Sequence, residues 1–168
     1  MRVILIACTI MLSFISISQT AWTWTELDTM PSKISNNAVT EAEIGGETYV
    51  FSFGGIDTTK LYSGINQRAF KYRVSNDSWS ELAPLPSTLT NIAAGASTVK
   101  NKIYILGGYH VYSNNNEVSS NEVIIYNPTT DLYEANGAPI PTAIDDHVQC
   151  VWRDSLIYVI TGWSNTGN

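Results

Sequence analysis

Short apolar runs, each ended by glycine, recur along this chain at a nearly constant spacing. They are Tyr49–Gly55, Ile103–Gly108 and Ile157–Gly162. A period of about 54 residues separates the corresponding positions Gly54, Gly107 and Thr161. Each run is rich in β-branched and aromatic residues. Such runs predict buried β-strands that end at a tight backbone position.

Three other features share this spacing. The same interval, to within one position, separates three dipeptides that end in proline and three large aromatic residues. It also separates two tyrosines, each of which precedes one of those aromatic residues by seven positions. Self-similarity at a fixed period indicates stacked structural units that bury their faces against their neighbours. The positions are Met30-Pro31, Leu85-Pro86 and Ile140-Pro141; Trp24, Trp79 and Tyr133; and Tyr72 and Tyr126.

The alternation of apolar and polar residues predicts strands throughout each unit. An additional strand is expected before the first unit, at Trp22–Leu27, where large apolar and polar residues alternate. Long polar loops are expected at Ile56–Asn66 and Tyr109–Asn121. The predicted strands of the units are Ala38–Ile44, Tyr49–Phe53, Gln67–Val74, Ser78–Leu82, Ile92–Val99, Ile103–Leu106, Glu122–Tyr126, Leu132–Glu134, His147–Trp152 and Leu156–Thr161.

This order of motifs resembles Kelch repeats, which are blades of a β-propeller. The resemblance implies an all-β fold, a partial Kelch-type propeller of about two and a half four-stranded antiparallel blades. The repeats span about 31–82, 86–135 and, incompletely, 141–168. Two positions depart from the pattern, since Thr161 replaces a glycine and Tyr133 a tryptophan. The resemblance also implies that Trp22–Leu27 is a closing strand that completes the last blade.

A propeller needs at least about four blades, more than this sequence supplies. Open blade faces would leave apolar surface in water, at a cost of about 25 cal/mol per Å². We therefore expect either further C-terminal blades in a longer chain or self-association that covers the open faces.

Composition narrows the possible partners. The chain has 15 Asp and Glu residues against 9 Lys and Arg, a formal net charge of −6, which argues against nucleic-acid binding. Of its two cysteines, Cys8 lies in the N-terminal apolar run, which leaves Cys150 alone. Neither a disulfide nor a cysteine-based zinc site is expected, and no metal or cofactor is predicted.

The N-terminus predicts export from the cytoplasm. Residues 1–18 have a basic residue, an apolar run and small residues at the end, which is typical of a signal peptide. Cleavage after Ala21, an uncleaved anchor and a lipoprotein signal at Leu5–Cys8 are the alternatives. Residues 19–168 would then form the propeller domain of a secreted or periplasmic protein, with no other membrane contact. In a eukaryotic source, Asn76-Asp77-Ser78 would be a glycosylation acceptor.

The long loops of the blades would open on one face, and function usually lies on loops held by a rigid scaffold. Aromatic residues on these loops form a candidate binding rim for sugars or peptides, because flat rings stack on apolar surfaces. Simple packing or exposure of the same rings is the alternative. The predicted rim residues are Tyr62, Tyr109, His110, Tyr112 and Trp163.

A second candidate group lies where the chain enters each innermost strand. Asn36, Asn91 and Asp146 each follow the repeated proline by five positions, and His147 is adjacent to the last of them. These polar groups are expected to converge near the axis and to hold water or a ligand. The local cluster of Asp145, Asp146 and His147 could transfer protons or hold a metal. Turn capping by the Asp and Asn side chains is the alternative.

The preferred functional interpretation is a binding module that presents its loop face to a protein or glycan. The alternative is a carbohydrate-active propeller enzyme, because exported Kelch-like chains are similar to sialic-acid mutarotases and to galactose-oxidase-like copper enzymes. Tyr109-His110 is similar to adjacent copper ligands of the latter. No catalytic residue is identified for either enzyme class.

Overall fold

The computed structural model describes residues 22–86 and 91–165, and the chain is all-β there apart from two short 3₁₀ turns. The predicted signal peptide, residues 1–18, and its cleavage sites lie outside the described residues. Within the described part, no helix has the length and apolar character needed to cross a membrane.

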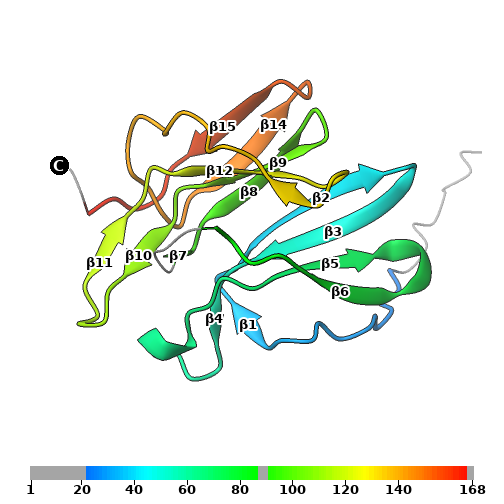
Figure 1. Cartoon of the computed structure of the whole chain (residues 1–168), viewed down its shortest axis with the longest axis horizontal. Helices are drawn as coiled ribbons and strands as arrows, with labels where there is room; N and C mark the ends of the chain where they lie inside the picture. The colour runs from blue at the N-terminus through cyan, green and yellow to red at the C-terminus, as the bar shows by residue number, and fades with distance from the viewer. Residues whose placement is uncertain (1–21, 87–90, 166–168) are drawn as a thin grey trace, which may run out of the picture.

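Two four-stranded antiparallel sheets and one hairpin fan out side by side in the described residues (Figure 1). In each sheet, strands that follow one another along the chain are neighbours, as expected of propeller blades. The predicted blades and the half-complete third unit are therefore confirmed. Blade one contains β2 (Ala38–Ile44), β3 (Glu47–Phe53), β5 (Ala69–Arg73) and β6 (Ser78–Leu82). Blade two contains β8 (Gly95–Val99), β9 (Lys102–Leu106), β12 (Val123–Asn127) and β13 (Leu132–Tyr133), and hairpin three contains β14 (Val148–Trp152) and β15 (Leu156–Ile160).

The core lies between blade one and blade two. Because side chains alternate along a strand, one face of β3 presents Phe51 and Phe53 to the facing sheet. The Tyr126 ring from β12 packs against both, with ring centroids 5.8 Å from Phe51 and 5.6 Å from Phe53. Ile103 and Ile105 of β9 complete this buried cluster. Blade faces thus bury their apolar side against the next blade, which is the physical reason for the repeat.

A tyrosine–aspartate pair is repeated at the outer edge of both blades. The Tyr72 hydroxyl donates to Asp77 at 2.6 Å, and the Tyr126 hydroxyl donates to Asp131 at 2.5 Å. Both tyrosines lie directly opposite an outer-strand aromatic residue, Trp79 or Tyr133, with ring centroids 5.1 Å apart in each pair. The seven-residue spacing seen in the sequence is therefore one antiparallel turn that packs two tilted rings against each other.

The strand predicted at Trp22–Leu27 is not formed in the described chain. The described chain has no strand there, and Trp22 and Trp24 are 84% and 96% exposed. A strand needs a hydrogen-bonded neighbour, and none of the described strands pairs with this segment. The chain is first anchored at Asp28, whose carbonyl accepts a hydrogen bond from the Trp79 indole at 2.9 Å.

Small sheets extend each unit beyond the glycine-ended strands, at the end of the molecule that we call the loop face. The expected loops Ile56–Asn66 and Tyr109–Asn121 therefore contain ordered strands. In the described chain, the first small sheet pairs β1 (Ile34–Ser35) with β4 (Ile56–Asp57). The second has the order β11 (Glu117–Ser119), β10 (Tyr109–Val111), β7 (Asn91–Ile92), and the third unit has one bridge, Asp145 to Trp163. The 3₁₀ turns are η1 (Tyr62–Gly64) and η2 (Val74–Asn76).

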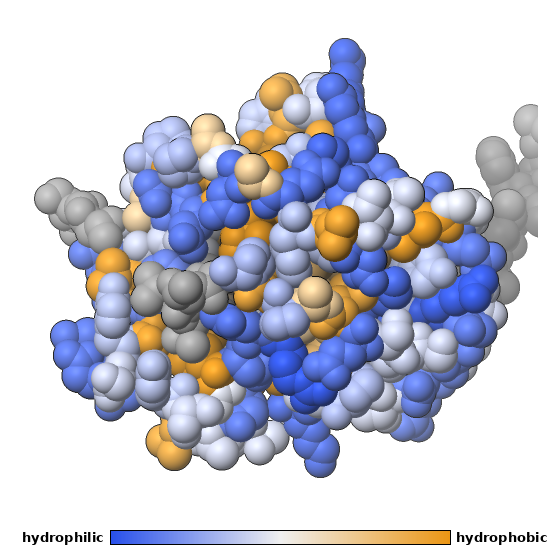
Figure 2. All heavy atoms as spheres, in the orientation of Figure 1, coloured by the Kyte–Doolittle hydropathy of each residue, from blue (hydrophilic) through white to orange (hydrophobic). Residues whose placement is uncertain are grey.

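The face of the molecule seen in Figure 2 carries both apolar and polar residues. Apolar residues form several patches there, separated by polar side chains.

Candidate binding pocket on the loop face

The chain enters each innermost strand through a residue in the left-handed conformation. These residues are Asn36, Ala93 and Asp146, with φ values of 55°, 55° and 47°. The Ala93 amide donates to the Asn36 carbonyl at 2.9 Å, and the Asp146 amide donates to the Ala93 carbonyl at 3.3 Å. Backbone hydrogen bonds thus link the three units at this point and fix the entry to each blade.

Asn91 does not occupy the position predicted for it. The equivalent of Asn36 and Asp146 is Ala93, because the connection into β8 is two residues longer than the other two. Asn91 instead begins β7 and lies opposite His110 in the small sheet. Asn and Asp tolerate positive φ better than other non-glycine residues, but blade two has alanine there. The expected ring of three polar side chains is therefore interrupted.

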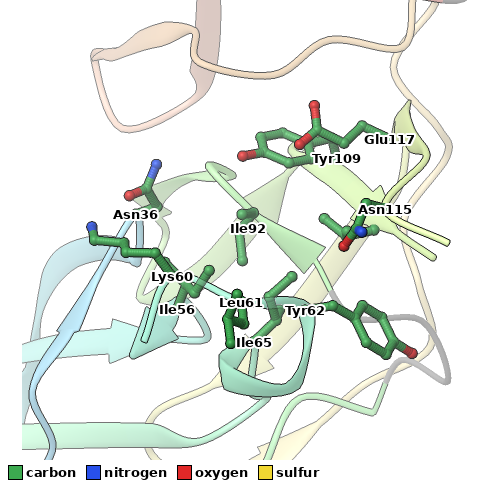
Figure 3. A pocket seen from close by; sticks show the side chains of 11 residues that line it. Asn36, Ile56, Lys60, Leu61, Tyr62, Ile65, Ile92, Tyr109, Asn115 and Glu117 are labelled. Atoms are coloured by element: carbon green, nitrogen blue, oxygen red, sulfur yellow. The ribbon is translucent and has the colours of Figure 1, made fainter. Parts of the chain in front are cut away.

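A pocket of about 300 Å³ opens between the small sheets of blades one and two (Figure 3). Its floor is apolar: Ile56, Ile65 and Ile92 form a buried cluster, with Tyr109 and Val111 packed against it. Ile56 and Ile65 are bridged to each other, so the loop of blade one folds back to build this floor. The pocket is thus made by two loops that are distant in the sequence.

The rim of the pocket carries opposite charges. Figure 3 shows Lys60 and Asn36 on one side of the pocket and Glu117 and Asn115 on the other. The Lys60 ammonium donates to the Ser35 hydroxyl at 2.8 Å, and no carboxylate of the described residues pairs with it. Lys60 has a φ of 58°, a backbone conformation that is uncommon for lysine. Burial raises the pKa of the Tyr109 hydroxyl, and the carboxylate of Glu117 raises it further.

Only some residues of the predicted aromatic rim lie at the pocket. Tyr62 and Tyr109 line the pocket, whereas Tyr112 and Trp163, 41% and 67% exposed, do not. His110 is buried, because alternation along β10 turns it away from the face that carries Tyr109 and Val111. Its Nε2 atom lies 3.6 Å from a carboxylate oxygen of Glu122. Tyr109 and His110 are therefore adjacent in sequence but face opposite sides of the small sheet.

Asp145 and His147 are buried at the junction of blade two and hairpin three, whereas Asp146 between them is exposed. The Ser119 hydroxyl donates to Asp145 at 2.5 Å, and burial raises the pKa of this carboxyl. Burial lowers the pKa of His147, neither of whose ring nitrogens has a hydrogen-bond partner. None of these residues lines the pocket. In the described part of the chain, no three His, Cys, Asp or Glu side chains group together as metal ligands would.

Lys60, Asn115 and Glu117 were not among the residues predicted from the sequence. They come from two different loops, and no motif or spacing relates them. The only available signal was the pair of isoleucines, Ile56 and Ile65, at the ends of an otherwise polar loop. Such a pair indicates that the loop packs on itself.

Comparisons with known proteins agree with this architecture. The Kelch motif matches residues 93–134. Kelch-like protein 33 of Homo sapiens is 30% identical over 148 residues, which is 86% of this chain and 25% of that protein. The solved structure of YjhT superposes with a TM-score of 0.58 at 21% identity, covering 79% of this chain and 35% of that one. The chain thus spans about a quarter of the curated relative and about a third of the solved chain.

Proposed function

Because the chain is built from Kelch repeats, we propose that it is a non-catalytic binding module that works outside the cytoplasm. Its loop face takes a protein or glycan ligand, with the pocket between blades one and two as the contact site. The packed blades supply a rigid scaffold, and loops on such scaffolds commonly carry binding residues.

The observation that carries this proposal is the composition of the pocket. Isoleucines at its floor and polar and charged side chains at its rim offer a ligand both kinds of contact, and 300 Å³ lies at the lower end of the usual volume range of ligand sites. Tyr62 and Tyr109 add large amphipathic rings that contact a ligand without losing much conformational freedom. Both residues were predicted as binding residues from the sequence.

The enzyme alternative has less support in the described residues. Asp145 and His147 are buried beneath the loop face, where Asp145 is engaged by Ser119. A general acid or base must come within hydrogen-bond reach of its substrate. The pocket itself offers one carboxylate, Glu117, without a second acid or a histidine beside it.

The first test is an array experiment with the immobilised chain, probed with glycans and with peptides. Tyr62→Ala should weaken capture of the bound probes about five- to thirtyfold, because truncating an aromatic contact residue typically removes about 1–2 kcal/mol of binding energy. Tyr62 is 39% exposed, so the substitution should leave folding intact. The matched control is Tyr112→Ala, since Tyr112 is similarly exposed on the loop face but lies outside the pocket. Equal loss with both variants, or loss with neither, would overturn the proposal.

A further inference from the structure

We infer that the ligand of this pocket is an extended polypeptide segment with an apolar side chain flanked by an acidic residue on one side and a basic residue on the other. The inference rests on the proposed function, because it concerns the same site. It names the chemical class of the ligand and states that the site selects one order of charges over the reverse.

The first argument is the placement of charge. Lys60 and Glu117 line one pocket and lie on opposite sides of it (Figure 3). Neither forms an ion pair within the described part of the chain, so both charges are free to pair with a ligand. A complementary ligand therefore carries a carboxylate near Lys60 and a cation near Glu117.

The second argument is the floor between the two charges. Ile56, Ile65 and Ile92 present an apolar surface of limited extent, and the Tyr109 ring flanks it. This space suits one large apolar side chain as an anchor. A polypeptide supplies an apolar side chain and both charges within a few residues. A neutral sugar supplies no charge, and an acidic sugar supplies only the anion.

The third argument is that the two sides of the pocket are held in place independently. Lys60 belongs to a loop closed by the Ile56–Ile65 bridge, and its ammonium donates to Ser35. Glu117 belongs to β11, where Asn165 donates a side-chain hydrogen bond to its carbonyl oxygen. The spacing of the charges is therefore set by the scaffold, and the site can distinguish the order of charges in a ligand.

The test uses the full chain and four capped, fluorescently labelled heptapeptides with leucine at position four and glycine elsewhere. The first has Asp at position two and Lys at position six, and the second has these two reversed. The third has Asn at both positions, and the fourth has the flanks of the first with Gly in place of leucine. Fluorescence anisotropy measures the dissociation constants.

One of the two charge orders should bind about tenfold more tightly than the other and than the Asn-flanked peptide. The double variant Lys60→Glu/Glu117→Lys exchanges the charges of the rim and should invert the preferred order. Lys100→Glu/Glu43→Lys makes the same two exchanges near the β-turns at the other end of the blades and should leave the order unchanged. The Gly-centred peptide should bind most weakly.

Results that overturn this inference alone can be distinguished from results that also overturn the proposed function. Equal binding of both charge orders, or a preference that the rim double variant does not invert, would overturn this inference. A glycan array on which Lys60→Glu and Glu117→Lys weaken capture, without binding of any charged peptide, would also overturn it while leaving the proposed function standing. Binding of neither peptides nor glycans by the wild-type chain would overturn both.

Discussion

Thr161 shows most directly how one residue can depart from its repeat. It adopts a φ of 56°, while its counterparts Gly54 and Gly107 have φ values of 61°. A β-branched residue is strained in this conformation, because its Cβ approaches the neighbouring carbonyl oxygen. The Thr161 hydroxyl donates to the carbonyl of Ile160 at 2.7 Å, but both groups are exposed and the bond adds little. The repeat thus imposes a glycine conformation on a threonine.

Thr161→Gly should therefore raise the free energy of unfolding by about 1 kcal/mol, the cost of holding a side chain in the left-handed region. Urea unfolding followed by tryptophan fluorescence measures the change. Thr161→Ala is the control, because alanine keeps the Cβ and should bring no comparable gain. A stability of Thr161→Gly at or below that of wild type would show that the threonine carries no strain.

At the scale of elements, hairpin three is attached to blade two around His147. A Cβ on Gly95 would lie 2.6 Å from His147 Nε2, and one on Gly107 would lie 2.3 Å from the carbonyl oxygen of Ile144. Gln149 adds a hydrogen bond to the carbonyl of Ala96 at 3.0 Å. The two elements approach closely because glycines in blade two leave room for the imidazole ring and the preceding backbone.

The attachment should weaken in mild acid. Burial lowers the pKa of His147, while the carboxylates of Asp145 and Asp146 oppose this shift. Below pH 6.5 the unfolded chain therefore takes up a proton that the folded chain excludes, and the free energy of unfolding falls. One proton limits the slope to about 1.4 kcal/mol per pH unit.

Urea unfolding of wild type and His147→Gln between pH 7.5 and 5 measures this effect. The raised pKa of Asp145 acts in the opposite direction as the pH falls, and His147 itself lowers that pKa. The difference between the two stability curves therefore measures the titration of His147 together with its effect on Asp145. Parallel curves across this range would contradict the prediction.

At the scale of the whole molecule, the outward face of hairpin three is apolar. Its register places six residues on one side of the hairpin, and five of them are large hydrophobic side chains that are 48–59% exposed. A continuous apolar face of this kind normally packs against another surface. The residues are Val148, Cys150, Trp152, Leu156, Tyr158 and Ile160.

The 168-residue chain should self-associate through this face at micromolar concentration, because association would bury these apolar side chains. Analytical ultracentrifugation measures the mass as a function of concentration. Leu156→Glu/Ile160→Glu should shift the distribution toward the monomer. Glu41→Gln/Glu43→Gln is a control on blade one, remote from hairpin three. A wild-type chain that is monomeric at all concentrations would refute the prediction.

Much of the fold could be predicted from local patterns. The boundaries of β2 and β6 match the predicted Ala38–Ile44 and Ser78–Leu82, and the other blade strands differ from their predicted spans at one or both ends. Local pattern could not decide whether Trp22–Leu27 forms a strand. Alternation of apolar and polar residues gives a segment two different faces, but it does not supply the neighbouring strand that the backbone must pair with. The sequence pattern also did not identify Ala93 as the equivalent of Asn36 and Asp146. The connection into β8 has two additional residues, which displace the equivalent position although the repeat period of the strands is unchanged.

The sequence by itself determined the blades, because the repeat period, the glycine-ended strands and the paired aromatic rings are all set by contacts within one unit or between adjacent units. Only the tertiary structure decided the pocket. Lys60 and Glu117 meet there because packing of blade one on blade two brings two separate loops together. The relative positions of such loops depend on the angle between sheets, which no local pattern encodes.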